Sequence, residues 1–116
     1  MMTELANKKC EPCEGKTKPF DRNEANAYLK DAAGWLLTED ARGIYREYVT
    51  KNFTAAVDLI NKIAAIAEKE DHHPDIHLTG YRKLRVDLST HAINGLSEND
   101  FIVAAKINTV PVELKG

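Results

Sequence analysis

The sequence has no long hydrophobic run. Its longest apolar stretches are interrupted by Asp58, Asn61, Lys62 and Glu68. The opening segment MMTELANKKC contains no apolar region of signal-peptide length. We therefore expect no membrane segment and a cytoplasmic location.

The sequence also lacks an excess of charge of one sign. Sixteen Lys and Arg residues stand against eighteen Asp and Glu residues, and the basic ones do not cluster. This balance gives no support to direct nucleic-acid binding. With 43% hydrophobic and 29% charged residues in 116, the composition favours one compact globular domain.

Cysteine is scarce, and its two copies form a single C-x-x-C at Cys10 and Cys13. A zinc ribbon needs two such pairs, and a thioredoxin-like motif belongs between a strand and a helix. We favour two reduced thiols over metal or disulfide chemistry. The surrounding turn formers predict an N-terminal arm over residues 1–19, outside the core of a domain over residues 20–116: Pro12, Gly15 and Pro19.

Two helices are predicted from capping-box patterns. Asp21 with Glu24 begins a helix over residues 22–32, and Ser97 with Asp100 begins the last helix. Gly34 can end the first of these helices, and Pro111 marks the end of the last one.

A longer helix lies between them and has the strongest periodicity. Asn52 is a suitable N-cap, and apolar residues then recur at helical spacing. The helix should finish near Asp71, because Pro74 disfavours the α conformation at His73. The apolar stripe consists of Phe53, Ala56, Val57, Ile60, Ile63, Ala64 and Ala67.

Four segments read as strands. Residues 35–39 and 43–50 flank a short turn and predict a hairpin, and residues 75–80 and 82–91 follow the long helix. In the last segment Leu84, Val86 and Leu88 alternate with polar residues, as in a half-buried antiparallel strand. The order αββαββα predicts an α+β fold, with helices packed on one face of a four-stranded antiparallel sheet.

Three histidines fall at element ends. His72 and His73 end the long helix and His91 ends the last strand, where strand alternation would turn its side chain away from the core. Each could be an ordinary exposed histidine. Together they could line one pocket, with Glu68, Asp71 and Asp75 close in sequence to supply carboxylates. Such carboxylates fix an imidazole's tautomer, which suits general acid and base work.

Two rival kinds of site have less support. His73 and His77 have the i, i+4 spacing of helical zinc ligands, but Pro74 forbids a continuous helix between them, so we expect no metal. Ser89 and Thr90 adjoin His91, but neighbours on a strand face opposite sides, which does not suit a catalytic triad. We expect His77 to be a strand residue outside the cluster.

The complete spacing resembles a known family. Glu68-x3-His72-His73-Pro74-x6-Tyr81-x9-His91-x8-Asp100 is similar to the signature of the pterin-4a-carbinolamine dehydratases, as are the segments EKEDHHPD, LSTH and GLSENDFIVAAKI. The resemblance extends over residues 21–107. One extra residue between His73 and His91 resembles the bacterial and plant branch, whereas animal members carry an aromatic residue at Ile76 and an arginine at Asn99.

This resemblance implies a lyase that dehydrates 4a-hydroxytetrahydrobiopterin to the quinonoid dihydropterin, without a metal or organic cofactor. It implies proton transfer by His72 and His73, with His91 orienting the pterin or sharing the acid role. The positions implied to contact substrate are Glu68, Asp71, Pro74, Tyr81, Ser89, Thr90 and Asp100. Structural readings stay open: Asp71 could end the helix, Tyr81 could be a strand residue, and for Asp100 we favour capping.

The resemblance also implies partners. Homodimers or homotetramers are expected, and a pterin-dependent aromatic amino acid hydroxylase is a candidate partner. The alternative function is a catalytically idle pterin-binding or coactivator-like module, because a complete motif does not prove turnover.

Overall fold

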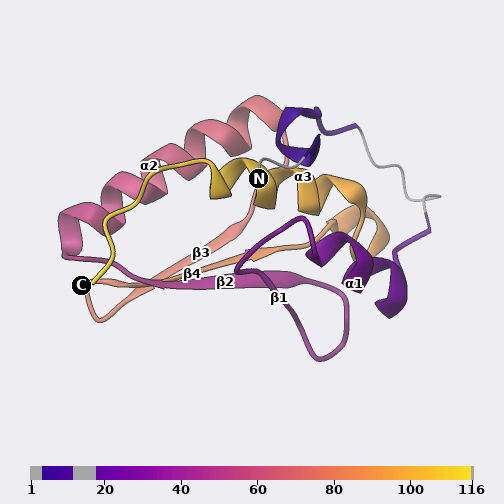
Figure 1. Ribbon diagram of the computed structural model, residues 1–116, viewed down its shortest axis with the longest axis horizontal. Helices are drawn as coiled ribbons and strands as arrows, with labels where there is room; N and C mark the ends of the chain where they lie inside the picture. Colours follow the sequence, from indigo (N-terminus) through magenta and orange to yellow (C-terminus); the bar gives the residue numbers. More distant parts are fainter. Residues whose placement is uncertain (1–3, 12–17, 116) are drawn as a thin grey trace.

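The computed structural model describes residues 4–11 and 18–115, and its elements form a single sheet with helices over it (Figure 1). The sheet has the order β1-β2-β4-β3, and every neighbouring pair is antiparallel. This confirms the predicted α+β fold. The elements are η1 (Glu4–Asn7), α1 (Arg22–Leu29), β1 (Leu36–Leu37), β2 (Ile44–Val49), α2 (Phe53–Glu70), β3 (Asp75–Thr79), β4 (Lys83–Leu88), η2 (His91–Ile93) and α3 (Glu98–Asn108).

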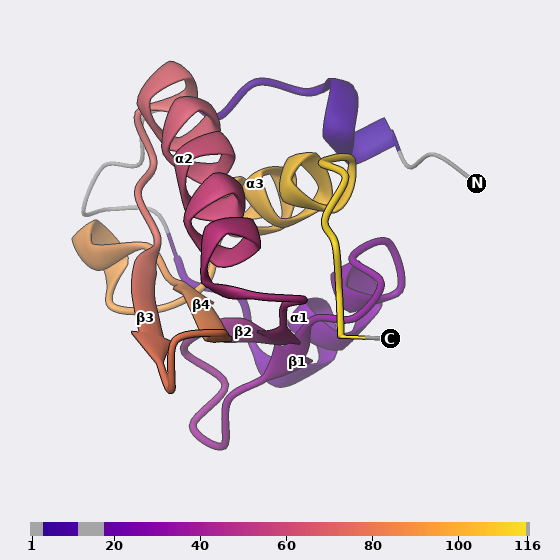
Figure 2. The ribbon, with the colours of Figure 1, turned by 90° about the vertical axis from the view of Figure 1, so that its left-hand side faces the viewer.

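The helices α2 and α3 lie over the same face of the sheet (Figure 2). On β4, Leu84, Val86 and Leu88 are buried beneath them, while Arg85 and Asp87 are only partly buried. The alternation predicted for this strand is therefore confirmed, and its apolar side is the floor of the core.

Helix α3 is the centre of the molecule. Eight of its eleven residues are buried, which is more than an amphipathic surface helix can bury. It packs against α2, α1 and η1, and the Phe101 ring lies 5.2 Å from that of Tyr28. The side chains of Asn99 and Asp100, near the N-terminus of α3, are therefore buried within the packed structure.

Both predicted capping boxes are present, at Asp21 with Glu24 and at Ser97 with Asp100. The first helix, however, ends at Leu29 rather than at residue 32. The chain tightens there into turns with i to i+3 hydrogen bonds, and these turns bring Ala32 into the core.

The last strand is also shorter than predicted. It ends at Leu88, and His91 begins the short 3-10 helix η2 instead of continuing the strand. The turn is closed by the Thr90 N–H, which donates to the Gly95 carbonyl oxygen at 2.8 Å. His91 is exposed, as predicted from strand alternation, but it belongs to η2 and not to the strand.

The N-terminal segment differs from the expected free arm. Leu5 is 5% exposed and belongs to the hydrophobic core, and Ala6 and Cys10 pack against that core. Cys13 falls outside the described residues. Among the residues described, no helix is long and apolar enough to cross a membrane.

Candidate active site

A pocket of about 540 Å³ opens where α2 ends, within the size range of small-molecule sites. Its wall comes from the end of α2, the β4–η2 connection, the start of α3 and the N-terminal segment. A larger hollow, of about 870 Å³, lies on the outer side of the sheet and contains His77 but none of the other three histidines. The smaller pocket is lined by Cys10, Glu11, Glu70, Asp71, His72, His73, Pro74, Asp75, Ser89, Thr90, His91, Ala92 and Asn99.

The first histidine of the pocket is paired with a buried carboxylate. His72 Nε2 lies 2.7 Å from Asp100 Oδ1, and the Asp100 side chain is fully buried. The other oxygen, Oδ2, accepts from the Thr90 hydroxyl at 2.8 Å and from the Ser97 N–H at 3.0 Å. A carboxylate held on both oxygens fixes the imidazole it contacts and favours an Nε2–H, which leaves Nδ1 for other partners.

The second histidine has a different environment. His73 Nε2 contacts Glu68 Oε2, and both side chains are more than half exposed. Solvent can therefore exchange protons with His73 more readily than with His72, whose side chain is only 12% exposed.

These neighbouring histidines diverge because of how α2 ends. Asp71 adopts a left-handed conformation with φ 52°, and the His72 N–H bonds back to the Ala67 carbonyl oxygen. Pro74 follows and prevents any further helix. The helix ends near Asp71, as predicted. The left-handed conformation of Asp71, which turns His72 toward Asp100, was not predicted. The only hint of it in the sequence is that Asp tolerates this conformation better than most residues do.

The first residue of η2 is the third histidine. His91 is exposed on the pocket wall, beside half-buried Ser89 and buried Thr90. The three histidines are thus brought to one pocket. His77, as expected, lies on β3, with its Nε2 3.8 Å from Asp87 Oδ2.

Tyr81 is not brought to this pocket. It lies in the turn between β3 and β4, 57% exposed with φ 55°, whereas the pocket is at the Asp75 end of β3. Five strand residues separate the two ends, a length of roughly 17 Å. Within one chain, Tyr81 therefore lies at the far end of β3 from the pocket, and its contact with substrate stays a prediction. Glu68 also does not line the pocket, but it reaches the pocket through His73.

Five pocket residues were missed at the sequence level: Cys10, Glu11, Glu70, Ala92 and Asn99. Glu70 had a visible signal, because it extends the apolar stripe of α2 by three residues after Ala67 and is buried like the rest of that face. Its Oε1 accepts the Cys10 N–H at 2.9 Å. In the described part of the chain, no group of three or more His, Cys, Asp or Glu side chains could hold a metal ion.

Fold and pocket together define a class of protein. It is a small α+β domain with a pocket whose titratable groups include three histidines, two of them paired with carboxylates, and this set is suited to moving protons on a small ligand. The model of the pterin 4 alpha carbinolamine dehydratase family matches residues 18–110. The chain belongs to this family.

Individual relatives agree with that assignment. A Halorhodospira halophila protein assigned as a pterin-4-alpha-carbinolamine dehydratase is 46% identical, over 91% of this chain and 96% of its own length. The mitochondrial pterin-4-alpha-carbinolamine dehydratase 2 of Arabidopsis thaliana is 43% identical over 97% of this chain, which spans 62% of the plant protein. A crystal structure titled transcriptional coactivator/pterin dehydratase from Brucella melitensis superposes with a TM-score of 0.73 at 33% identity, over 79% of this chain and 97% of that chain.

Proposed function

We propose that the protein dehydrates a 4a-hydroxytetrahydropterin, 4a-hydroxytetrahydrobiopterin in the first instance, by histidine acid and base catalysis. The product is the quinonoid dihydropterin, ready for reduction in tetrahydropterin recycling. The observation that carries the proposal is the fixed His72–Asp100 pair in a pocket that also contains His73 and His91.

The reaction needs two proton transfers. An imidazolium gives a proton to the 4a-hydroxyl oxygen, the C4a–O bond breaks, and water leaves. A neutral imidazole takes the proton from N5, and the N5–H electron pair forms the C4a=N5 bond. The two histidines then exchange their protonation states through solvent, so no net proton is consumed.

His72 and His73 suit these two transfers because their surroundings differ. Asp100 holds His72 in one tautomer, while the exposed His73 can exchange its proton with water. His91 orients the pterin and stabilises the cationic charge that develops as water leaves, or shares the acid role. Asp71, Ser89 and Thr90 are proposed to contact the substrate.

Single replacement of each histidine tests this function. His72→Ala, His73→Ala and His91→Ala should each slow enzyme-dependent loss of the 4a-hydroxytetrahydropterin, by about 10²- to 10⁴-fold for a proton-transfer group. His77→Ala is the matched control, because His77 lies on the outer side of the sheet, and its rate should equal that of the wild type. Near-wild-type rates in all three pocket variants would contradict the proposal, and pterin binding without acceleration would indicate an idle binding module.

We also propose self-association and a cytoplasmic location. Support for a homodimer or homotetramer comes from the edge of the sheet, where β3 pairs with β4 on one side only. The substrate implies an upstream reaction that hydroxylates C4a of a tetrahydropterin. A pterin-dependent aromatic amino acid hydroxylase is therefore the proposed metabolic partner.

A further inference from the structure

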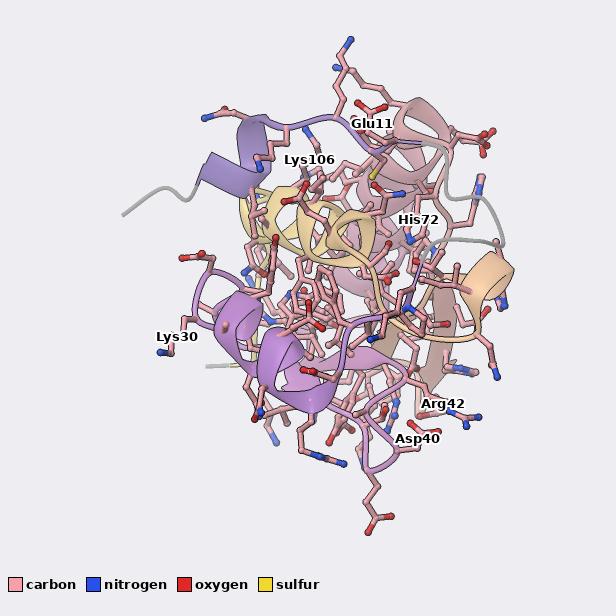
Figure 3. All side chains as sticks on the ribbon, turned by 90° about the vertical axis from the view of Figure 1, so that its right-hand side faces the viewer. Glu11, Lys30, Asp40, Arg42, His72 and Lys106 are labelled. Carbon is pink, nitrogen blue, oxygen red and sulfur yellow. The ribbon has the colours of Figure 1, made fainter. Side chains whose placement is uncertain are left out.

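The N-terminal strap, residues 4–11, runs along α3 and ends at the pocket (Figure 3). The strap precedes the region that the family model matches, which begins at residue 18. It is nevertheless anchored: Leu5 lies in the core, and the Lys106 ammonium of α3 donates to the Ala6 carbonyl oxygen at 2.9 Å.

At the pocket end of the strap, the Asn99 side chain bonds to both the backbone N–H and the backbone carbonyl of Glu11. Asn99 Oδ1 accepts the Glu11 N–H at 2.9 Å, and Asn99 Nδ2 donates to the Glu11 carbonyl oxygen. The Cys10 thiol lies 3.6 Å from the Asn99 carbonyl oxygen. Because Asn99 is only 6% exposed, this amide clamp is largely shielded from competition by water.

A buried carboxylate also depends on the strap. The side chain of Glu70 is 4% exposed, its Oε1 accepts the Cys10 N–H at 2.9 Å, and its Oε2 lies 3.7 Å from Lys106 Nζ. A carboxylate buried this deeply needs such partners. The strap therefore completes the hydrogen bonding of two pocket-wall residues, Glu70 and Asn99.

Cys10 and Glu11 line the same pocket as the histidines. We propose that the strap is a wall of the pterin pocket and that Asn99 is the positioning residue that holds this wall against the bound substrate. The inference rests on the proposed function. It assigns the strap and Asn99 to substrate binding, and leaves the proton transfers to the histidines.

Kinetics of Asn99→Ala test the assignment. The variant removes both clamp hydrogen bonds and leaves the histidines in place. KM for the 4a-hydroxytetrahydropterin should rise about tenfold, the effect of losing the net free energy of roughly two hydrogen bonds, while kcat stays within about threefold of wild type. Lys9→Ala, an exposed strap position, is the matched control and should leave both constants unchanged.

Equilibrium binding separates this inference from the proposed reaction. The dissociation constant of a non-reacting oxidised pterin, measured by its fluorescence, should also rise about tenfold in Asn99→Ala. If the wild type binds this pterin but does not turn over the carbinolamine, the proposed function fails and the strap assignment stands. If the wild type binds no pterin, both fail.

A thiol measurement reports on the wall directly. In a Cys13→Ser background Cys10 is the sole cysteine of the chain. Saturating pterin should slow its alkylation at least several-fold, and Asn99→Ala should speed alkylation of the unliganded protein. Two results would overturn the inference and leave the strap a purely structural element. One is a Cys10 alkylation rate that does not change when pterin is added. The other is an Asn99→Ala variant that loses kcat and thermal stability while its KM stays unchanged.

Discussion

Asp100 joins two functions in one side chain. Its Oδ2 closes the capping box of α3 through the Ser97 N–H, while its Oδ1 contacts His72. The sequence favoured capping as the role of Asp100, and the capping is confirmed. The contact with His72 adds a second role, which the geometry allows because the two carboxylate oxygens point to different partners.

Replacing Asp100 by Asn tests that second role. We expect Asp100→Asn to lower kcat by about 10- to 100-fold, because the amide no longer fixes the tautomer and orientation of the His72 imidazole. The free energy of unfolding should also fall by about 1–3 kcal/mol, because a charge-assisted hydrogen bond is lost in a buried site. Turnover and thermal denaturation measure the two effects.

Ser97→Ala is the control for this comparison. It removes the capping hydroxyl and should cost about 1 kcal/mol of stability, while His72 keeps its partner and the rate is preserved. If Asp100→Asn lost only as much activity as Ser97→Ala, Asp100 would serve the helix alone.

At the scale of elements, the end of α2 decides where two active-site side chains go. Asp71 leaves the helix in the left-handed region at φ 52°, and Asn94 does the same after η2 at φ 51°. Non-glycine residues adopt this region at a cost of roughly 1 kcal/mol. Two roles can offset this cost at Asp71. Either the residue is needed only to turn the backbone, or its carboxylate acts in the pocket.

Glycine at position 71 separates these possibilities. We expect Asp71→Gly to keep or raise thermal stability, by up to about 1 kcal/mol, because the αL turn no longer carries a Cβ. Turnover should fall, because the pocket loses a carboxylate placed beside His72. Asn94→Gly gives the same backbone relief outside the pocket and should retain full activity. Equal activity of the two variants would show that Asp71 only ends the helix.

The elements themselves were largely predictable from local patterns. Capping boxes and apolar periodicity depend on residues close in sequence, so α2, the start of α3 and the β1–β2 hairpin were predicted correctly. The misjudged features depend on turns and core packing that these patterns do not reveal. Tight turns after Leu29 place Ala32 in the core, and β4 ends before a turn that the Thr90–Gly95 hydrogen bond closes. Leu5, from the N-terminal segment, packs in the core beside α3.

For the whole molecule, the uncovered parts of the sheet predict assembly. The Cα radius of gyration of one chain is 13.8 Å, and the β3 edge is open along Asp75–Thr79. An exposed strand edge is a site at which a second chain can pair. We expect light scattering to give a dimer or tetramer and X-ray scattering to give a radius clearly above 13.8 Å at micromolar concentration. A mass of one chain at every concentration would contradict this expectation.

The sequence by itself determined the α+β element order, the histidines at element ends and, through the spacing of Glu68 to Asp100, the family. These features are carried by local periodicity and by a linear motif, so they need no knowledge of distant contacts. The tertiary structure alone decided that His72 meets Asp100 across 28 positions, that Tyr81 lies away from the pocket, and that the strap forms one of its walls. Such contacts depend on how α2, α3 and the N-terminal segment pack together, because burial and paired hydrogen bonds between distant segments fix them.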